Sequence, residues 1–404
     1  MGRVETNFKQ TEAGLIPVDW EVKSLSKIGF LKKGKGIKKN EVLPDGIACI
    51  RYGELYTHHN EYIKTINSYI SREVAKQSQK IETGDILFAG SGETREEIGK
   101  CATFLQDIEA YAGGDVIIMS PQNCDSLFLG FILNTPVASS QKAKSGQGDA
   151  VVHLYPRDIA KILIPLPPTK TEQTAIANAL SDADLYIESL EKLIDKKQKI
   201  KQGAMQQLLK PKPHWELKKL GEVAEYKNGK TLEKFVVEDG EFFLITLNSI
   251  DIKGSLKTNH LTINRSDNFL ERGDLVMVLS DVAHGNFLGL TDVIPEKNKY
   301  ALNQRMGALK NLKEVLPKFL SYYINLHQAY FKSCGKGSSQ QNLGKEDILS
   351  FDVYLPDRLE QECILNILSD MDSEITALTQ KLTKAKAIKQ GMMQQLLTGK
   401  IRLI

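Results

Sequence analysis

The chain has 404 residues, of which 41% are hydrophobic and 25% charged, so it holds enough apolar material for two or three domains of roughly 150 residues. The longest clean apolar stretch, residues 127–133, is far shorter than the roughly 18 residues of a membrane span, and no leader pattern opens the sequence. Five scattered cysteines without a C-x-x-C pair favour a reducing cytoplasm, and a net charge of +3 does not by itself indicate nucleic acid.

In chain order, residues 1–168 are predicted to form a first globular domain of mixed α and β structure. Its clearest strand patterns are at 86–88, 116–119 and 162–164, and a helix is expected at 127–134. Two loops rich in lysine and glycine, 32–39 and 142–147, separate these elements. The proline-rich residues 165–168 mark the passage from this domain into the next element.

A long helix is predicted over residues 169–210, because apolar residues recur at steps of four and three. The expected coiled-coil positions are Ile176, Leu180, Ala183, Ile187, Leu190 and Ile194. Beyond Ile194 the pattern shifts to Ile200, Ala204 and Leu208, which predicts a relaxed supercoil there. Gly203 costs a helix about 1 kcal/mol, which suggests close backbone packing or a bend at that point.

Residues 211–356 are predicted to form a second mixed α and β domain, and residues 357–404 a second long helix with a C-terminal tail. Strands are expected at 242–246, 275–279 and 351–355, and a helix at 318–328. The coiled-coil positions of the second helix are Ile364, Leu368, Met371, Ile375, Leu378 and Leu382.

The two long helices are an internal repeat. Residues 172–209 align without a gap on residues 360–397 at a shift of 188, with 20 of 38 positions identical. A weaker likeness precedes each copy, with Trp20 matching Trp215 and Gly34 matching Gly229, both at a shift of 195. The chain therefore consists of two units of about 190 residues, each a divergent globular part followed by a closely repeated helix.

Charge is polarised along both helices, acidic in the first half and basic in the second. Residues 170–190 carry a net charge of −3 and 191–213 a net charge of +5, while 357–380 carry −5 and 381–402 carry +6. An antiparallel pair would place each acidic half beside a basic half, so we predict antiparallel pairing. The alternative is that each helix, roughly 57 Å long, only covers its own domain.

No catalytic motif survives inspection. The turn from Phe88 to Gly92 superficially resembles a loop that binds S-adenosylmethionine, but residues 277–281 have no glycine, so a tight loop is the better interpretation. Asp19, Glu21 and Lys23 are the residue types of a metal-dependent nuclease but fit a solvated strand face better. The sequence has no phosphate-binding G-x-x-x-x-G-K-[ST] motif and no histidine pattern for a metal.

Basic loops remain as candidates for DNA binding, because lysine and arginine bind phosphates while glutamine and asparagine can pair with adenine. In the first domain the candidates are Lys32, Lys33, Lys35, Lys38, Lys39, Arg51, Arg95, Lys142, Lys144 and Gln147. In the second they are Lys227, Lys230, Lys234, Arg305, Lys332, Lys336, Gln340 and Gln341.

Several motifs together resemble those of the specificity subunits of type I restriction-modification systems. They are Gly14-Leu15-Ile16-Pro17 with Trp20-Glu21-Val22, Leu-Pro followed by Glu-Gln before each helix, Leu-Ser-Asp and Gln-Gly-x-Met-Gln-Gln-Leu-Leu within each helix, and the ending Leu397-Thr398-Gly399-Lys400-Ile401-Arg402-Leu403. They span the whole chain. A departure between the two copies is the pair Pro211 and Pro213 after the first helix, against Gly399 after the second.

The resemblance implies an α+β protein with two mixed α/β target-recognition domains in a pseudo-two-fold arrangement, separated by two long antiparallel helices that form a coiled-coil spacer. Each domain would read one half of a divided sequence in double-stranded DNA, and the helices would set the spacing and dock methyltransferase subunits, two in number. Restriction subunits that translocate DNA would join through that core. This chain would hold no cofactor or metal and no catalytic site, with S-adenosylmethionine, ATP and Mg²⁺ bound by the partners of a DNA adenine methyltransferase and ATP-dependent endonuclease.

Two other functions stay open on the sequence alone. The first is a stand-alone DNA methyltransferase or nuclease, which would transfer a labelled methyl group or cut DNA without a partner. The second is a scaffold of tandem domains that binds proteins, against which salt-sensitive binding of DNA would argue.

Overall fold

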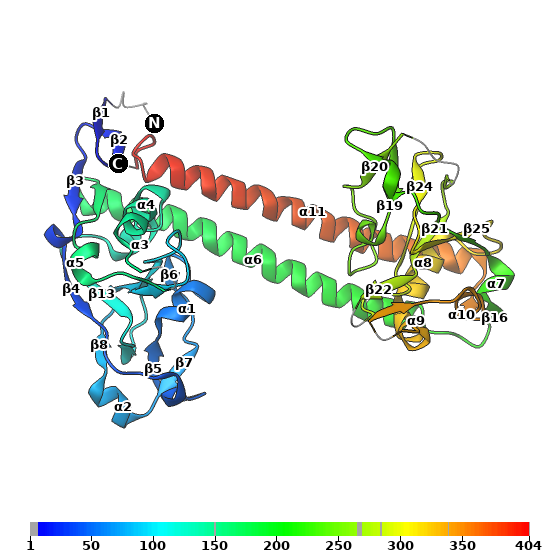
Figure 1. Cartoon of the computed structure of the whole chain (residues 1–404), viewed down its shortest axis with the longest axis horizontal. Helices are drawn as coiled ribbons and strands as arrows, with labels where there is room; N and C mark the ends of the chain where they lie inside the picture. The colour runs from blue at the N-terminus through cyan, green and yellow to red at the C-terminus, as the bar shows by residue number, and fades with distance from the viewer. Residues whose placement is uncertain (1–6, 149–150, 265–268, 283–284, 338, 404) are drawn as a thin grey trace. The chain divides into compact units, whose positions relative to one another are not determined.

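The computed structural model describes residues 7–148, 151–264, 269–282, 285–337 and 339–403, and the chain divides into two compact units. Unit 1 comprises Met1–Glu191 and Lys381–Ile404, and unit 2 comprises Lys192–Gln380. The two long helices, α6 (Lys170–Leu208) and α11 (Arg358–Leu396), each contribute one part to each unit (Figure 1). Within the described residues, no helix is both long enough and apolar enough to cross a membrane.

The globular part of unit 1 is built on two sheets. The first contains, in spatial order, β4 (Gly29–Lys33), β13 (Val116–Pro121), β9 (Ile86–Ala89), β11 (Cys101–Phe104) and β6 (Tyr62–Ile63). The second contains β7 (Ser68–Ile70), β5 (Ile47–Ile50), β12 (Ala110–Ala112) and β8 (Gln79–Ile81). Three two-stranded pairs join β1 (Phe8–Thr11) to β2 (Gly14–Pro17), β3 (Glu21–Ser24) to β15 (Leu163–Leu166), and β10 (Ser91–Gly92) to β14 (Val152–His153).

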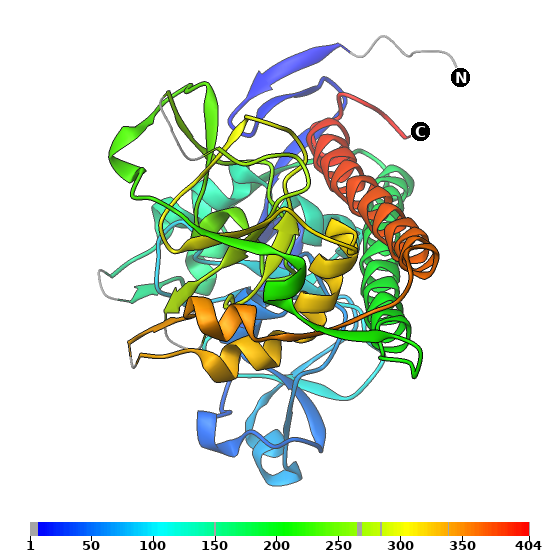
Figure 2. The same cartoon turned by 90° about the vertical axis from the view of Figure 1, so that its right-hand side faces the viewer.

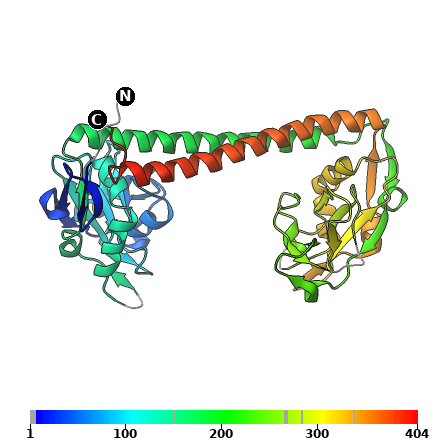
Figure 3. The ribbon, with the colours of Figure 1, turned by 90° about the horizontal axis from the view of Figure 1, so that it is seen from above.

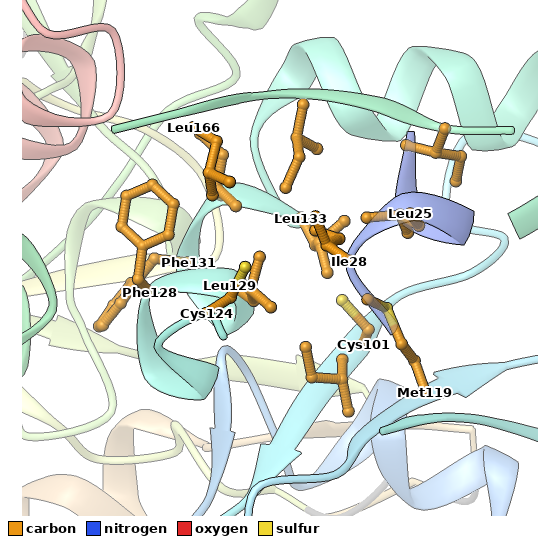
Figure 4. Packing of buried hydrophobic residues seen from close by; sticks show 14 of the residues in the cluster. Leu25, Ile28, Cys101, Met119, Cys124, Phe128, Leu129, Phe131, Leu133 and Leu166 are labelled. Atoms are coloured by element: carbon orange, nitrogen blue, oxygen red, sulfur yellow. The ribbon is translucent and has the colours of Figure 1, made fainter. Parts of the chain in front are cut away.

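Short helices cover these sheets, and apolar side chains fill the space between them. The helices are η1 (Leu25–Lys27), η2 (Lys39–Glu41), α1 (Tyr52–Thr57), α2 (Arg72–Gln77), α3 (Ser126–Ile132), α4 (Pro136–Ser145) and α5 (Pro156–Ile159). Figure 4 shows part of this core cluster, with Phe128, Leu129 and Phe131 of α3 on one side and Met119 of β13 beside Cys101 of β11 on the other. Every residue of β9 is buried, as expected of a strand covered on both faces.

Unit 2 repeats this plan with different residues. Its first four-stranded sheet contains, in spatial order, β17 (Glu225–Asn228), β25 (Met306–Lys310), β21 (Leu275–Val278) and β23 (Thr291–Val293). Its second contains β18 (Val236–Val237), β20 (Leu261–Ile263), β19 (Phe242–Ile245) and β24 (Tyr300–Leu302). The two-stranded pairs are β16 (Glu216–Lys219) with β27 (Asp352–Leu355), and β22 (Ser280–Val282) with β26 (Gln340–Asn342). Its helices are α7 (Leu220–Val223), η3 (Glu233–Phe235), η4 (Leu247–Ser249), α8 (Pro317–Leu326), α9 (Gln328–Cys334) and α10 (Lys345–Leu349), of which α8 lies against β23 (Figure 2).

All the strands and both short helices expected from the sequence are therefore present, and the fold class of mixed α and β structure in two repeated units is confirmed.

One shared strand pairing shows which residues of the two units correspond. In unit 1, β5 pairs in parallel with β12, with Ala48 opposite Ala110; in unit 2, β19 pairs in parallel with β24, with Phe243 opposite Tyr300. The residues that follow β5 and β19 therefore occupy equivalent places.

In unit 1, the first half of α6 lies antiparallel to the end of α11. Asp184 forms an ion pair with Lys389 at 2.7 Å, and Glu191, further along α6, pairs with Lys386, which precedes Lys389 on α11 (also 2.7 Å). Lys389 also contacts Glu61 of the globular part at 3.3 Å. The acidic half of one helix thus meets the basic half of the other, as the charge pattern predicted.

In unit 2, the second half of α6 and the first half of α11 are also antiparallel (Figure 3). Lys197 pairs with Glu374 at 2.6 Å, and Lys201 pairs with Asp372 at 2.5 Å. Lys201 and Asp372 are the counterparts of Lys389 and Asp184 at the repeat shift of 188. Each unit therefore contains the same lysine–aspartate pair, with the two partners exchanged between the helices.

The predicted coiled-coil residues are all buried or half-buried, and the first turns of α6 also pack on the core of unit 1, where Ile176 and Leu180 join Trp20. Of the predicted shift to Ile200, Ala204 and Leu208, the position of Ile200 is wrong, because this side chain is 46% exposed, whereas Ala204 and Leu208 are half-buried against the core of unit 2. Lys197 and Lys201 continue the three-four spacing of Ile194 instead, and these partly buried lysines carry the pairs with the opposite helix.

Candidate nucleic-acid interface

Two glycines fix where the first basic loop of each unit leaves its sheet. A Cβ on Gly34 would lie 1.9 Å from the carbonyl oxygen of Gly113, and one on Gly229 would lie 1.7 Å from that of Asn303. Only glycine permits such close approach of two backbones. The lysine that follows each glycine donates its backbone N–H to a strand of the unit's second sheet. Lys35 donates to the carbonyl of Ala112 in β12 and Lys230 to that of Leu302 in β24, so the two basic loops start at equivalent points.

In unit 1 this loop forms one wall of a cavity of about 510 Å³. The cavity brings together two predicted cations, Lys39 and Arg51, which are 12 residues apart in sequence. Tyr52, His58 and Asp115 also line it. The cavity therefore gathers two of the predicted DNA-binding side chains around one concave surface.

Arg51 is held by a buried carboxylate. Its Nε donates to Oε1 of Glu54 at 3.0 Å, and the hydroxyl of Ser68 donates to the same oxygen. The side chain of Glu54 is 4% exposed and that of Arg51 is 33% exposed. A buried carboxylate requires such a partner, so the two residues form a unit that fixes the arginine at the mouth of the cavity.

His59 is buried in the loop that follows α1, and within the described residues neither ring nitrogen has a hydrogen-bond partner. Burial lowers the pKa of His59, with a smaller opposing contribution from Glu54. The imidazole is therefore neutral at pH 7, and it serves as packing rather than as a cation for DNA.

A second group forms where β10 meets β14. Gln147 and His153 exchange backbone hydrogen bonds of 3.0 and 2.8 Å, which closes a hairpin whose Gly148 has φ of +109°. Nη2 of Arg95 donates to the carbonyl of Gly148 at 3.3 Å, and the hydroxyl of Ser91 is 3.0 Å from Nδ1 of His153. The predicted residues Arg95 and Gln147 are thereby placed together at one hairpin.

Unit 2 has the same hairpin with different side chains. Lys336 and Asn342 exchange backbone hydrogen bonds of 3.0 and 2.9 Å, and Gly337 has φ of +121°. Ser280, the counterpart of Ser91, donates to Oδ1 of Asn342 at 2.6 Å. Lys336 is partly neutralised by Asp347 at 3.1 Å. The scaffold is thus kept while the groups that it presents differ.

The other predicted residues near this hairpin lie on β26 and α9. Gln340 and Gln341 are half-buried on β26, and Gln340 donates to the side chain of Asn342 at 3.2 Å. Lys332 of α9 donates to Oδ1 of Asn286 at 3.1 Å. Lys332, Lys336, Gln340 and Gln341 are therefore brought together by the fold.

The remaining candidates of unit 2 lie around the first basic loop. Lys227 is half-buried on β17, Lys230 is exposed, and the ammonium of Lys234 lies 5.1 Å from the ring centre of Phe235. Arg305 is exposed in a turn with φ of +68°. Arg305 also accepts a hydrogen bond from the backbone N–H of Leu279, the residue before Ser280, so it adjoins the hairpin group.

In unit 1, Lys35, Lys38 and Lys144 are exposed. Lys32 donates to the carbonyl of Lys80 at 3.3 Å, and Lys33 lies 3.8 Å from Asp115. Both lysines lie on β4, an edge strand of the first sheet.

The prediction for Lys142 is wrong. Its side chain is fully buried, and Nζ donates to the carbonyls of Gly99 and Leu133 at 2.8 and 2.9 Å. Burial lowers the pKa of Lys142. The charge therefore ties α4 to the loop before β11 and cannot reach a phosphate, a role that a lysine-rich stretch of sequence does not reveal.

Sequence reasoning also missed Glu54, which holds Arg51, and the pair Ser91 and His153, of which His153 bonds to the backbone of Gln147. Ser91 and Ser280 match at a shift of 189, so the repeat alignment contained a signal for this pair. No pattern marked Glu54, because a single glutamate in a mixed region gives no sign of being buried.

The motifs rejected for catalysis have structural roles. Asp19 accepts two hydrogen bonds from Arg402, which hold the pKa of this carboxyl below its usual value. Gly90 lies in the bend after β9, where a Cβ would meet the carbonyl oxygen of Asp115, and Gly92 lies in β10, where a Cβ would meet the hydroxyl of Tyr56. Among the residues that the structure describes, no group of three or more histidines, cysteines or acids is placed to hold a metal ion.

Comparison with known proteins assigns this arrangement to a family. The model of the type I restriction modification DNA specificity domain matches residues 17–202 and again residues 213–388. The MjaVIII specificity subunit of Methanocaldococcus jannaschii is 24% identical over 427 residues, which cover 99% of this chain and 97% of the relative. The EcoKI specificity subunit of Escherichia coli K12 is 23% identical, with 96% of this chain and 90% of the relative covered. The crystal structure of the type I system S subunit from M. genitalium matches with a TM-score of 0.60 at 17% identity, covering 93% of this chain and 96% of that one.

Proposed function

Because the chain belongs to the type I restriction-modification DNA specificity family and is a specificity subunit with two tandem DNA specificity domains, we propose that each unit reads one half of a divided DNA sequence. The observation that carries this proposal is that the two units keep one scaffold and change the side chains that its loops present. The hairpin with Ser91 and the hairpin with Ser280 are built alike, yet one presents Arg95 and Gln147 and the other Lys336 and two glutamines.

The division of the chain follows from the same idea. Residues 1–168 and 211–356 act as target-recognition domains, residues 169–210 and 357–404 hold the two helices and the tail, and the paired helices set the distance between the half-sites. Antiparallel pairing in each unit supports this role, because the repeated lysine–aspartate pairs give the helices one register.

Type I specificity subunits bind DNA and assemble with other subunits of their systems, and they are the non-catalytic components. We assign this chain two methyltransferase subunits and, through them, restriction subunits that translocate DNA. The assembled complex methylates adenine and cuts DNA with ATP, and S-adenosylmethionine, ATP and Mg²⁺ bind to the partners. The complex works in the cytoplasm.

A domain exchange tests the division of labour. Residues 17–168 are replaced by the matching segment of another family member, and adenine methylation is mapped across the host genome by sequencing. One half of the methylated sequence should change and the other half should stay the same. A change in both halves, or in neither, would contradict the assignment.

A matched insertion tests the spacing role. Seven residues are added to α6 after Lys192 and seven to α11 after Gln380, so that the lysine–aspartate pair of each unit is kept. Because seven helical residues are about 10 Å long, the gap between the half-sites should lengthen by at most about three base pairs. Methylation at an unchanged gap would exclude the helices as the spacer.

A further inference from the structure

Arg51 occupies a place that is built for an extended cation. It follows β5, whose Ile50 is fully buried, and it is the residue before α1. Ile50 and Leu55 of α1 belong to the same buried core cluster, so Arg51 lies between two segments that are anchored in the core. The side chain projects from this point into the 510 Å³ cavity.

Glu54 leaves one edge of the guanidinium available. The carboxylate takes only the Nε–H of Arg51, at 3.0 Å. Within the described residues, no hydrogen bond involving Nη1 or Nη2 of Arg51 is found. A guanidinium that is held through Nε presents two parallel N–H groups, which is the geometry that pairs bidentately with O6 and N7 of guanine.

The cavity has room for the edge of a base. Gly53 has open space where a Cβ would lie, and a Cβ on Gly114 would meet nothing closer than the carbonyl oxygen of Gly36 at 3.7 Å. These glycines leave the wall beside Arg51 free of side chains. Lys39, exposed on the opposite wall, is placed for a phosphate.

The equivalent place in unit 2 has no such group. Thr246 follows β19 as Arg51 follows β5, and Ser249 stands where Glu54 does. The hydroxyl of Ser249 accepts a hydrogen bond from the backbone N–H of Thr246 at 3.0 Å, so this pair caps the short helix η4 and, among the described residues, holds no cation. The arginine and its buried carboxylate are therefore confined to one unit.

We propose that Arg51 reads a guanine in the half-site recognised by unit 1, with Glu54 as its positioning residue. The inference rests on the proposed function, because it requires unit 1 to contact DNA. Guanine is preferred over the other bases because only its major-groove edge offers two adjacent acceptors to the two free N–H groups.

The test uses the complete methyltransferase complex that contains the full-length chain, with oligonucleotide duplexes that carry the mapped sequence and each single base-pair change. Arg51→Lys keeps a cation beside Glu54 but removes the two-pronged donor. This variant should reduce the preference for one G·C pair in the unit 1 half-site by about ten- to a hundredfold, with no change at other positions. Glu54→Gln should relax the same base pair by a smaller factor and leave the others alone.

Lys39→Gln is the matched control, since it removes a cation from the same cavity. It should weaken methylation of all duplexes alike and reduce the salt dependence of binding. Arg51→Lys behaving in this way, or a unit 1 half-site without any G·C pair, would overturn the assignment of Arg51. Thermal unfolding of each variant, followed by Trp20 fluorescence, separates loss of recognition from loss of fold.

The domain exchange described above keeps the two proposals apart. If replacing residues 17–168 leaves both half-sites unchanged, the proposed function fails and the inference falls with it. If the exchange changes one half-site but Arg51→Lys leaves the preference at every base pair intact, only the inference fails.

Discussion

The two units secure the end of a long helix in different ways. In unit 2, α6 ends at Leu208, and the chain continues through residues 209–215 directly into that unit's globular part. In unit 1, α11 ends at Leu396, and the tail that follows has no covalent link to the globular part that it contacts. The repeat shift of 188 places Arg402 of this tail at the position of His214 in the linker.

Ion pairs replace the covalent link in unit 1. Arg402 donates to both oxygens of Asp19 at 2.9 Å and to Oε2 of Glu172, also at 2.9 Å. Its guanidinium carbon lies 5.8 Å from the ring centre of Trp20, and Glu172 is buried. The hydrogen bonds that Arg402 donates to Glu172 raise the pKa of Arg402; partial burial opposes this, and the hydrogen bonds that it donates to Asp19 add to the rise.

In unit 2, Glu360 takes the place of Glu172 and gathers three donors from the linker. These are Lys212 at 2.5 Å, His214 at 2.9 Å and the indole N–H of Trp215 at 3.1 Å. Burial opposes ionisation of Glu360, but these hydrogen bonds bring its pKa below the usual value. The junction of unit 2 shares its polar contacts among several donors, whereas the ion pairs of the tail in unit 1 all come from one arginine.

Removing that arginine should have the largest effect. Arg402→Ala leaves Glu172 buried without a cation, so we expect it to lower the free energy of unfolding of unit 1 by about 4 kcal/mol. His214→Ala, at the equivalent position, should cost unit 2 less than about 1 kcal/mol, because the histidine is 61% exposed and Lys212 remains.

The chain offers a probe for each unit, since its two tryptophans are Trp20 in unit 1 and Trp215 in unit 2. Urea unfolding of unit 1 is followed in a Trp215→Phe background, and that of unit 2 in a Trp20→Phe background. Equal losses for Arg402→Ala and His214→Ala would show that the tail is no more dependent on its ion pairs than the linker is.

Removing the lysine of each repeated lysine–aspartate pair should also lower the free energy of unfolding more in unit 1 than in unit 2, but by a smaller margin than removing Arg402 and His214 does. Lys389 compensates two carboxylates, Asp184 and Glu61, that are both more than four-fifths buried. Lys389→Met should therefore destabilise unit 1 by about 3 kcal/mol. Lys201→Met should cost unit 2 only about 1 kcal/mol, because Asp372 is 41% exposed and keeps its hydrogen bond from Tyr322. Chemical unfolding read by the two tryptophans checks this order, and a reversed order would contradict it.

Acid should weaken unit 1 through His59. Burial lowers the pKa of His59 in the folded chain, so the unfolded chain takes up a proton first as the pH falls below about 6.5. Neutral His59 therefore contributes its full stabilisation to the free energy of unfolding above about pH 6.5. This contribution is lost as the pH falls from about 6.5 to the pKa of the folded chain, at up to about 1.4 kcal/mol per pH unit. His59→Phe should remove this slope from unit 1 unfolding curves between pH 6.5 and 5, and an unchanged slope would exclude His59 as its source.

His260 is the matched group in unit 2. Burial also lowers its pKa, but the side chain is only half-buried and its Nδ1 lies 3.2 Å from the hydroxyl of Ser249. The slope in unit 2 should therefore be shallower than in unit 1. A steeper slope in unit 2 would show that burial does not set the order.

The sequence was sufficient for the features that repeat or that follow a strict period. The strands at 86–88 and 275–279 and the antiparallel helices could be predicted because apolar spacing and charge are properties of neighbouring residues. The sequence could not show that Lys142 is buried, because its partners are backbone carbonyls, of Leu133 before α4 and of Gly99, 43 residues away, and carbonyls leave no mark in a sequence pattern. The cavity around Arg51 was out of reach for the same reason, since three separate segments build it.

The slip predicted at Ile200 failed for a different physical reason. Hydrophobic spacing assumes that the interior of a helix pair is apolar, but Lys201 buries its aliphatic stem there and keeps its charge on Asp372. A pattern that counts only apolar residues therefore predicts that the contact between the two helices ends at the point where ion pairs continue it.

Gly203 of unit 2 and Gly391 of unit 1 provide the smallest test, at a point where the two units should agree. The sequence suggested close packing or a bend, yet α6 and α11 are each continuous, and a Cβ at either glycine would meet nothing within 4 Å. Gly203→Ala and Gly391→Ala should each stabilise the chain by about 0.5–1 kcal/mol, since alanine restricts the unfolded chain and fits the open space. Urea midpoints should rise equally for the two variants at constant slope. The two glycines lie in the repeated segment, and each substitution lowers the conformational entropy of the unfolded chain by the same amount. A gain in one unit alone would therefore show that the two helix pairs differ in the folded chain.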